Sequence, residues 1–306
     1  EQPLVKRGEK SMAIVENKSR GERIFNGVNI FILLLLTLIF FYPLWHCLMA
    51  SFSDPGKLLA NSGALLWPAG YSLRGYEAVL SNQNILTGYQ NTLFYVIVGT
   101  SLSMVLTLVG AYALTRQGLM LKKPIMVMIV ITMYIGGGMI PDFMVVSKLG
   151  LFDSRWSVIL ATAITTYNLM VMRTAFLQVP HSLEESAMLD GANDFVILWR
   201  ILLPVTKATI AVMALFYAVG RWNAWFNASI FLRSRSKYPL QLFLREILIA
   251  NQTSGNDGVT SEDGMFYLEE VIKYCTIIVS TVPILCIYPF VQKYFVTGVM
   301  LGSVKG

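Results

Sequence analysis

The sequence predicts an all-α polytopic membrane protein with six transmembrane helices. Of its 306 residues, 55% are hydrophobic and only 14% are charged, and the mean hydropathy is +0.58. A soluble domain cannot bury that much apolar surface. Several apolar runs are long enough to cross a hydrocarbon core, which needs about 20 residues. The lysines and arginines gather beside these runs, as topology signals do, so we expect no nucleic-acid partner.

The chemistry-bearing residues do not group into a catalytic or metal site. There are two histidines, and Cys47, Cys275 and Cys286 lie inside apolar runs without the spacing of metal ligands. An intramembrane enzyme would need a paired nucleophile and base, and a secondary transporter would need intramembrane carboxylates, of which the predicted spans hold almost none. We therefore expect a non-catalytic chain that binds neither metal nor cofactor. A purely structural membrane subunit stays open at this point.

The first third of the chain is a basic arm followed by two spans. Residues 1–23 carry six lysines and arginines, which predicts a cytoplasmic N-terminal arm by the positive-inside rule. The first span covers 24–49, with a kink expected at Pro43. Residues 51–88 are rich in turn signals and contain no long apolar run, so we expect an outer loop there. The second span covers 89–114.

The third predicted span, 124–147, is interrupted by a run of three glycines centred on Gly137 and then by Pro141. Such a sequence unwinds or bends a helix, which a bilayer tolerates only inside protein or along a watery path. We place the break beside a path through the membrane, and close helix packing is the competing explanation. The fourth span covers 156–177.

The fifth predicted span, 205–231, carries polar residues well inside an apolar stretch. A charged side chain at mid-membrane costs about 2.5–3.5 kcal/mol, so Arg221 should face a cavity or a partner. An interhelical salt bridge that fixes the packing is the alternative. The residues assigned to the membrane path are Gly137, Asn168, Arg221, Trp222, Asn223 and Asn227.

The chain continues with an outer loop, a last span and a short tail. Residues 233–269 are expected outside, and the segment 251–264 within them is small, polar and flexible in composition. The sixth span covers 271–295, and a cytoplasmic tail covers 297–306. The transmembrane region as a whole therefore extends over 24–296.

A polar island at 180–204 separates the fourth and fifth spans. Ser182 followed three residues later by Glu185 is a capping box, which predicts that a helix starts there. Gly191 can take the left-handed conformation that ends this helix. The island therefore begins as a short helix that closes in a glycine corner.

A second short helix is expected after the corner, capped by Asn193 or Asp194. Pro204 should stop it or mark the first turn of the next helix. Its apolar positions recur at three and four residues, at Phe195, Leu198, Trp199 and Leu202. A two-helix hairpin cannot bury this stripe within itself. It either lies on lipid headgroups or docks in a groove of a soluble partner.

The island closely resembles the EAA loop of ABC importer permeases. The matching residues are Glu185-Ser186-Ala187, Asp190-Gly191-Ala192, Ile201 and Leu203-Pro204. In that family the loop is the coupling helix, seated in a cleft of the ATPase subunit. The chain departs from the family at Ser186, usually alanine, and at Ala208, often proline. The resemblance implies a type I ABC importer permease fold, with ATPase-coupling roles for Ser182, Glu185, Ala187, Asp190, Gly191, Ala192, Ile201, Leu203 and Pro204.

Further motifs resemble the carbohydrate branch of these permeases with maltose-type topology. Those that resemble a subgroup importing oligosaccharides or polysaccharide fragments are Tyr134 to Pro141, Phe216 to Asn223 and Tyr238 to Glu246. The resemblance implies a bacterial cytoplasmic membrane protein with both termini in the cytoplasm. It also implies a second, homologous permease, two ATPase subunits that bind ATP and Mg, an extracytoplasmic binding protein, an oligosaccharide substrate and membrane lipid. A non-carbohydrate solute is the alternative.

The same resemblance assigns partner contacts to two segments. In maltose-type permeases the loop before the last span reaches into the binding protein, which implies this role for Asn251, Ser254, Asn256 and Asp257. A disordered loop tip is the alternative. The Gly-rich tail extends between the two ATPase subunits, which implies contacts from Gly302, Lys305 and Gly306.

Overall fold

The computed structural model describes residues 20–60, 63–116, 118–254, 270–287 and 289. Its first helices are α1 (Arg20–Ser51), α2 (Pro55–Ala60), α3 (Arg74–Ser81), α4 (Gln83–Thr115), α5 (Lys122–Tyr134), α6 (Met139–Lys148), α7 (Arg155–Leu160) and α8 (Thr166–Leu177). They are followed by α9 (His181–Leu189), α10 (Asp194–Val196), a π-helical turn (Ile197–Leu202), α11 (Leu203–Val205), α12 (Lys207–Trp222), α13 (Phe226–Phe231), a 3₁₀ turn (Arg235–Lys237) and α14 (Leu240–Ser254). Within the described residues the only β-type pairing is one bridge between Ser53 and Tyr71. The predicted all-α fold is confirmed.

Three of the described helices are long and apolar enough to cross a membrane on their own: α1, α4 and the helix Glu270–Ile287. Two more spans form if bent pairs count as one, namely α5 with α6, bent by 119°, and Asp194–Val205 with α12, bent by 88°. The predicted fourth span is divided into α7 and α8 by residues 161–165, and the fifth is broken at 223–225. Helices thus lie over all six predicted ranges, but three of the six are broken rather than continuous.

Each break has a local cause in the sequence. Gly138 lies between α5 and α6 at φ +85°, a conformation that side chains rarely adopt. At the end of α7, the Thr162 hydroxyl donates to the carbonyl of Val158 at 3.1 Å. At the end of α12, the Asn223 amide donates to the carbonyl of Val219 at 3.0 Å. Side-chain bonds of this kind replace or supplement backbone bonds where a helix ends, and the carbonyl of Val219 also accepts from the N–H of Asn223 at 3.1 Å.

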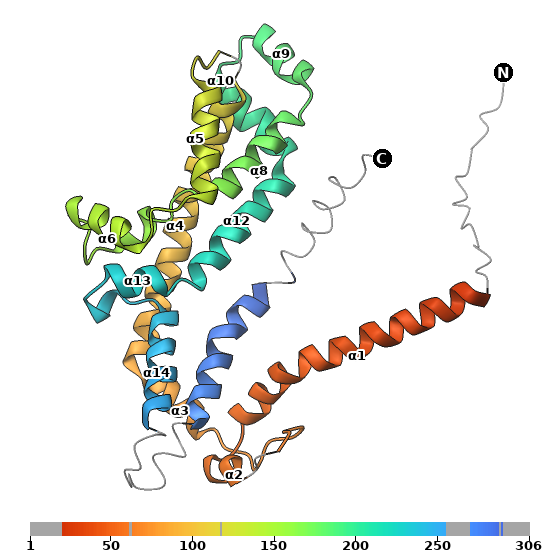
Figure 1. The fold of residues 1–306 in the computed structure, drawn as a ribbon, viewed down its shortest axis with the longest axis vertical. Helices are drawn as coiled ribbons and strands as arrows, with labels where there is room; N and C mark the ends of the chain where they lie inside the picture. Colours follow the sequence, from red (N-terminus) through yellow and green to blue (C-terminus); the bar gives the residue numbers. More distant parts are fainter. Residues whose placement is uncertain (1–19, 61–62, 117, 255–269, 288, 290–306) are drawn as a thin grey trace, which may run out of the picture.

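Helix α4 is the continuous element around which the bundle packs. It is 33 residues long, runs the length of the bundle and contacts α8, α12 and α14 (Figure 1). The Asn82 side chain caps its start by accepting from the N–H of Asn84 at 3.0 Å. Its buried ridge repeats every four residues and is small in the middle, at Gly99, Ser103, Thr107 and Ala111. Small residues at such positions allow neighbouring helices to approach closely.

The outer segments contain more helix than the sequence indicated. Residues 240–254 were expected in an outer loop, but they form α14, because Leu240, Phe243 and Leu244 bury against the bundle. Their spacing of three and four residues is helical and places them on one face. The predicted outer loop at 51–88 likewise contains α2, α3 and the first turn of α4.

Among the described residues, two apolar helices are covered little or on one side only. Helix α1 projects away from the other helices over most of its length (Figure 1), and the most apolar part of it has no buried residue. Helix α5 has no fully buried residue either, and only Ile125, Met126 and Ile129 pack against the core. A helix that is apolar on all sides requires lipid or another protein around it. The chain therefore presents two faces to the bilayer or to a membrane partner.

Candidate functional site

Helix α9 is the first arm of the hairpin predicted at 180–204. It begins at His181, with Pro180 in the preceding position, and no side chain caps it. The predicted capping box is therefore wrong, because Ser182 lies inside the first turn and not before it. The backbone of Pro180 is already fixed near helical φ, so it serves the start of the helix without a capping side chain. The Ser186 hydroxyl donates back to the carbonyl of Ser182 at 2.8 Å.

The glycine corner is formed as predicted. Gly191 has φ +80°, and its N–H donates to the carbonyl of Met188 at 3.0 Å. The N–H of Ala192 donates to the carbonyl of Ala187 at 2.9 Å, so the last carbonyls of α9 are satisfied. Asn193 then caps the second arm by accepting from the backbone N–H three residues later at 3.0 Å. Both local predictions, at Gly191 and at Asn193, are confirmed.

The second arm is one helical stretch, residues 194–205, that contains the π-helical turn. Its predicted apolar stripe is split between two environments: Leu198 and Leu202 are buried, whereas Phe195 and Trp199 are exposed. Pro204 lies in the last turn, just before the bend that leads into α12. The hairpin therefore buries two of these four apolar side chains against the rest of the chain and leaves the other two exposed.

The residues predicted for ATPase coupling lie on two different faces of this hairpin. The inward face is half-buried against the core around Met172 and Phe176 and includes Ala187, Ala192, Ile201 and Leu203. The other predicted coupling residues, Ser182, Glu185, Asp190, Gly191 and Pro204, are all exposed. Beside them Leu189 is 89% exposed and Phe195 is 73% exposed. The outward face thus combines carboxylates with large apolar side chains, a composition suited to a docking edge.

The sequence-based prediction missed the carboxylate that the hairpin turns inward. Glu184 is buried and pairs with Arg116, at the end of α4, with 2.7 Å between Nη2 and Oε2. The Tyr112 hydroxyl, also on α4, donates to Asp194 Oδ1 at 2.6 Å. Both arms of the hairpin are therefore bonded to the same helix. Two consecutive glutamates, Glu184 and Glu185, indicate an acidic helix turn, but the sequence alone does not show which of the two carboxylates faces the bundle.

A cavity of about 220 Å³ lies between α4, α7, α8, α12 and α13, where the spans are broken. Its polar lining consists of the predicted path residues Asn168, Arg221 and Asn227 and the hydroxyl residues Tyr95, Thr162, Thr165 and Tyr217. A second hollow of about 640 Å³ lies between α8 and α12 on the side of the hairpin, beside Gln178 and Thr206. The broken helices thus place polar groups at an internal space, as the sequence predicted for Arg221.

Arg221 is held without a carboxylate partner among the described residues. Its Nη2 donates to Ser103 Oγ at 2.7 Å and to the carbonyl of Thr162 at 3.3 Å, and its Nη1 donates to Thr162 Oγ1 at 3.3 Å. A further bond goes to the carbonyl of Ile159 at 3.4 Å. Its Nε is buried and has no partner. The interhelical salt bridge is therefore not seen, and the side chain keeps an unneutralised positive charge at the cavity.

The other predicted path residues lie elsewhere in this chain. Trp222 is buried, packs edge-on against Tyr89 and donates its Nε1 proton to the carbonyl of Ser280 at 3.3 Å. Asn223 is exposed at the end of α12. Gly137 is also exposed, and a Cβ there would meet only Pro141 Cβ at 3.7 Å. Close helix packing among the described residues therefore does not explain the glycine run.

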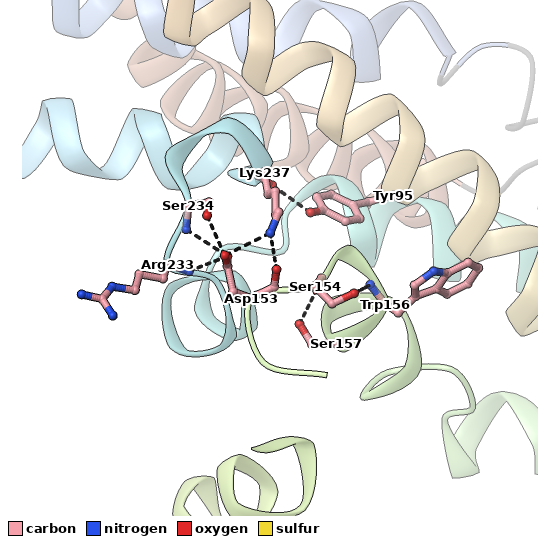
Figure 2. A network of polar contacts seen from close by, with 8 residues as sticks. All are labelled: Tyr95, Asp153, Ser154, Trp156, Ser157, Arg233, Ser234 and Lys237. Atoms are coloured by element: carbon pink, nitrogen blue, oxygen red, sulfur yellow. Dashed lines mark hydrogen bonds and ion pairs between the residues drawn. The ribbon is translucent and has the colours of Figure 1, made fainter. Parts of the chain in front are cut away.

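Asp153, between α6 and α7, joins its own connecting segment to the segment that follows α13 (Figure 2). Its Oδ1 accepts from the backbone N–H groups of Arg233 and Ser234 at 3.0 and 2.9 Å, and its Oδ2 accepts from the Ser234 hydroxyl at 2.6 Å. Lys237 completes the site with an ion pair at 3.0 Å. These bonds, led by the one from the Ser234 hydroxyl, hold the pKa of Asp153 well below its usual range.

This pKa shift predicts an acid-dependent loss of stability. A carboxyl whose pKa is lower in the folded state stabilises the fold above its unfolded pKa of about 3.9, and the contribution is lost as pH falls further. We expect Asp153→Asn to lower the thermal unfolding temperature in detergent at pH 7, and the gap from wild type to shrink towards pH 3. Ser234→Ala should reduce the same pH dependence. A gap that stays constant with pH would contradict this assignment.

The remaining predicted partner contacts lie at the edge of the described chain or outside it. Asn251 and Ser254 are in the last turn of α14 and not in a flexible loop, because the helix extends through Ser254. Asn256 and Asp257, like Gly302, Lys305 and Gly306 of the tail, lie outside the described residues.

More than nine-tenths of the chain is similar to known proteins. No family model matches it. The polygalacturonan/rhamnogalacturonan transport system permease protein YtcP of Bacillus subtilis is 41% identical over 286 residues, which cover 93% of this chain and 99% of that protein. Protein LplC of the same organism is 35% identical over 95% of this chain and 98% of its own length. A crystal structure of a bacterial ABC transporter involved in the import of the acidic polysaccharide alginate matches with a TM-score of 0.82 and 32% identity, over 91% of this chain and 99% of that one.

Proposed function

The chain belongs to the permease subunits of ABC sugar transporters, and on that premise we propose that it forms one half of an import path for acidic oligosaccharides. The observation that carries the proposal is the cavity at the broken spans, with the cationic Arg221 and the hydroxyl and amide groups beside it. Hydroxyl and amide groups suit sugar hydroxyls, and a guanidinium suits a uronate carboxylate. The names of the relatives, a polygalacturonan/rhamnogalacturonan permease and an alginate importer, support the acidic class.

The hairpin supplies the second part of the proposal, the connection to ATP. Its outward face, with Glu185, Leu189 and Phe195, fits the groove of a soluble partner better than a lipid surface, because the apolar side chains are flanked by carboxylates. We assign this partner as an ATPase subunit, present in two copies that bind ATP and Mg. This chain is then non-catalytic, and closure of the ATPase pair moves the hairpin and switches the cavity between its inward-facing and outward-facing states.

We infer the places of the remaining partners from the uncovered helix faces. The apolar faces of α1 and α5 are suited to a second, homologous permease and to lipid. The end of the molecule opposite the hairpin, near α3 and the end of α14, is left for the extracytoplasmic binding protein (Figure 1). We assign the hairpin and both termini to the cytoplasmic side of a bacterial cytoplasmic membrane.

Uptake by the reconstituted complex tests the proposed substrate class. We expect proteoliposomes that contain the two permeases and the ATPase subunits, supplied with the binding protein, to accumulate oligogalacturonides in an ATP-dependent manner. Neutral maltooligosaccharides of equal length should be taken up at least tenfold more slowly, because only the acidic sugar can pair with a buried cation. Equal uptake of both would overturn the acidic class, and uptake of neither sugar would favour a non-carbohydrate solute.

A further inference from the structure

Four side chains join the end of α4 to the hairpin, and we call them the α4 clasp: Tyr112, Arg116, Glu184 and Asp194. Arg116 pairs with Glu184 on α9 at 2.7 Å, and Tyr112 donates to Asp194 on α10 at 2.6 Å. The two halves also contact each other, since the Arg116 guanidinium lies 4.2 Å from the centre of the Tyr112 ring. One short helix end therefore holds both arms of the hairpin.

The Arg116–Glu184 half of the clasp is shielded, so this ion pair is not an ordinary surface pair, whereas Asp194 in the other half is exposed. The side chain of Glu184 is 7% exposed and that of Arg116 is 24% exposed. A carboxylate with so little access to water depends on its partner, and removal of that partner leaves an uncompensated charge. The hairpin therefore has a strong preference for one position relative to α4.

The same helix end is fixed to two neighbouring helices. Lys122 on α5 donates to the carbonyls of Thr115 and Arg116 at 3.1 and 3.2 Å, and Arg173 on α8 donates to the carbonyl of Leu114 at 3.3 Å. Cations at these positions satisfy the last carbonyls of the helix and oppose fraying. A displacement of the clasp therefore moves a helix end whose last carbonyls are hydrogen-bonded to neighbouring helices, and not a frayed end.

Helix α4 leads directly from the clasp to the cavity. Thr107 shares a 2.8 Å hydrogen bond with Tyr217, and Ser103 accepts the 2.7 Å bond from Arg221. Gly99 lies against the guanidinium, where a Cβ would approach Arg221 to 2.6 Å. At 1.5 Å per residue, Ser103 is about 14 Å along the helix from Tyr112. No helix break interrupts this distance.

We propose that α4 transmits the displacement of the hairpin to the Arg221 cavity, and that the α4 clasp residues are positioning residues for this coupling. The proposal rests on the proposed docking of the hairpin to an ATPase. A competing route runs through the chain itself, from α11 into α12, but that connection bends by 88° at one residue, Thr206. The clasp and the covalent route can be separated, because substitutions in the clasp leave the covalent route intact.

The test uses charge reversal in the full complex, with a reporter at the cavity. Asn227→Cys is introduced after Cys47, Cys275 and Cys286 are replaced by alanine, and its maleimide labelling rate is measured with and without a non-hydrolysable ATP analogue. We expect the analogue to change the rate at least fivefold in this reference protein, within the usual range of coupling between sites. Arg116→Glu and Glu184→Arg should each reduce the change to less than about twofold. The double swap should restore most of it.

Two further variants control for misfolding and for charge reversal as such. Tyr112→Phe removes one hydroxyl and keeps the ring, so it should assemble normally and still weaken the response to the analogue. Swapping Glu270 with Lys273, an ion pair on the last described helix and far from the hairpin, should leave the response unchanged. Assembly of each complex is verified by size-exclusion chromatography.

The outcomes separate this inference from the proposed function. If the reference protein does not respond to the ATP analogue, docking of the hairpin to an ATPase is itself refuted, and the α4 proposal falls with it. If the reference responds and the single clasp variants respond equally, only transmission through α4 is overturned. A loss that the double swap does not repair, together with an unaffected Tyr112→Phe, would also overturn it.

Discussion

Uptake of acidic oligosaccharides is expected to fall at least tenfold in Arg221→Met, and the thermal stability of the protein should fall with it. Methionine keeps the length and much of the apolar volume of the side chain but removes every donor. The carbonyls of Ile159 and Thr162, and the Ser103 hydroxyl, then lose their partner at a buried position. Each unsatisfied group costs about 1–3 kcal/mol, and the loss of a charged contact to substrate is of similar size. Uptake and unfolding of the same preparations measure both effects.

The substitution Gly99→Ala tests whether uptake depends on the position of the Arg221 guanidinium and not only on its charge. The added Cβ would lie 2.6 Å from Arg221, so the guanidinium must move although its charge is kept. We expect a loss of uptake close to that of Arg221→Met with a smaller loss of stability. The matched control is Gly110→Ala on the same helix, where the Cβ would meet only the flexible Cδ1 of Leu169, at 3.3 Å. Normal uptake by Gly99→Ala would contradict a role for the placement of the charge.

Features set by a few consecutive residues could be predicted from the sequence. The left-handed corner at Gly191 and the cap at Asn193 follow from their own side chains, and both are formed. The break at the glycine run in the third span is of the same kind. The capping box at Ser182 failed for an equally local reason, because Pro180 starts the helix earlier.

Features that depend on distant partners could not be predicted. Whether Glu184 or Glu185 turns inward depends on Arg116, 68 residues away in the sequence. The bonds of Arg221 reach Ser103 and Thr162, which are 118 and 59 residues away. Helix α14 was missed because its periodic apolar face lies in a segment bounded by polar residues, which favoured an outer loop. The segment is helical because this apolar face is buried against α4.

The corner at Gly191 should be the most sensitive single position of the hairpin. Gly191 has φ +80°, and a Cβ there would meet nothing within 4 Å. A substitution therefore acts through backbone conformation and not through steric contact with the described residues. The left-handed region costs an ordinary side chain about 1–2 kcal/mol, and a β-branched side chain tolerates it least. We expect Gly191→Val to reorganise the turn and to change how the outward face is presented.

The expected result is a loss of about tenfold in ATP hydrolysis stimulated by binding protein and sugar, with the chain still assembled with its partner permease. Gly191→Asn is the matched control, since asparagine is larger than glycine but adopts the left-handed conformation readily. Its stimulated hydrolysis should stay within about twofold of wild type, because a cost of a few tenths of a kcal/mol changes an equilibrium by less than that. Equal losses in both variants would show that bulk at the docking face matters and not the left-handed turn. If both variants keep the stimulated hydrolysis of wild type, the signal does not pass through this corner.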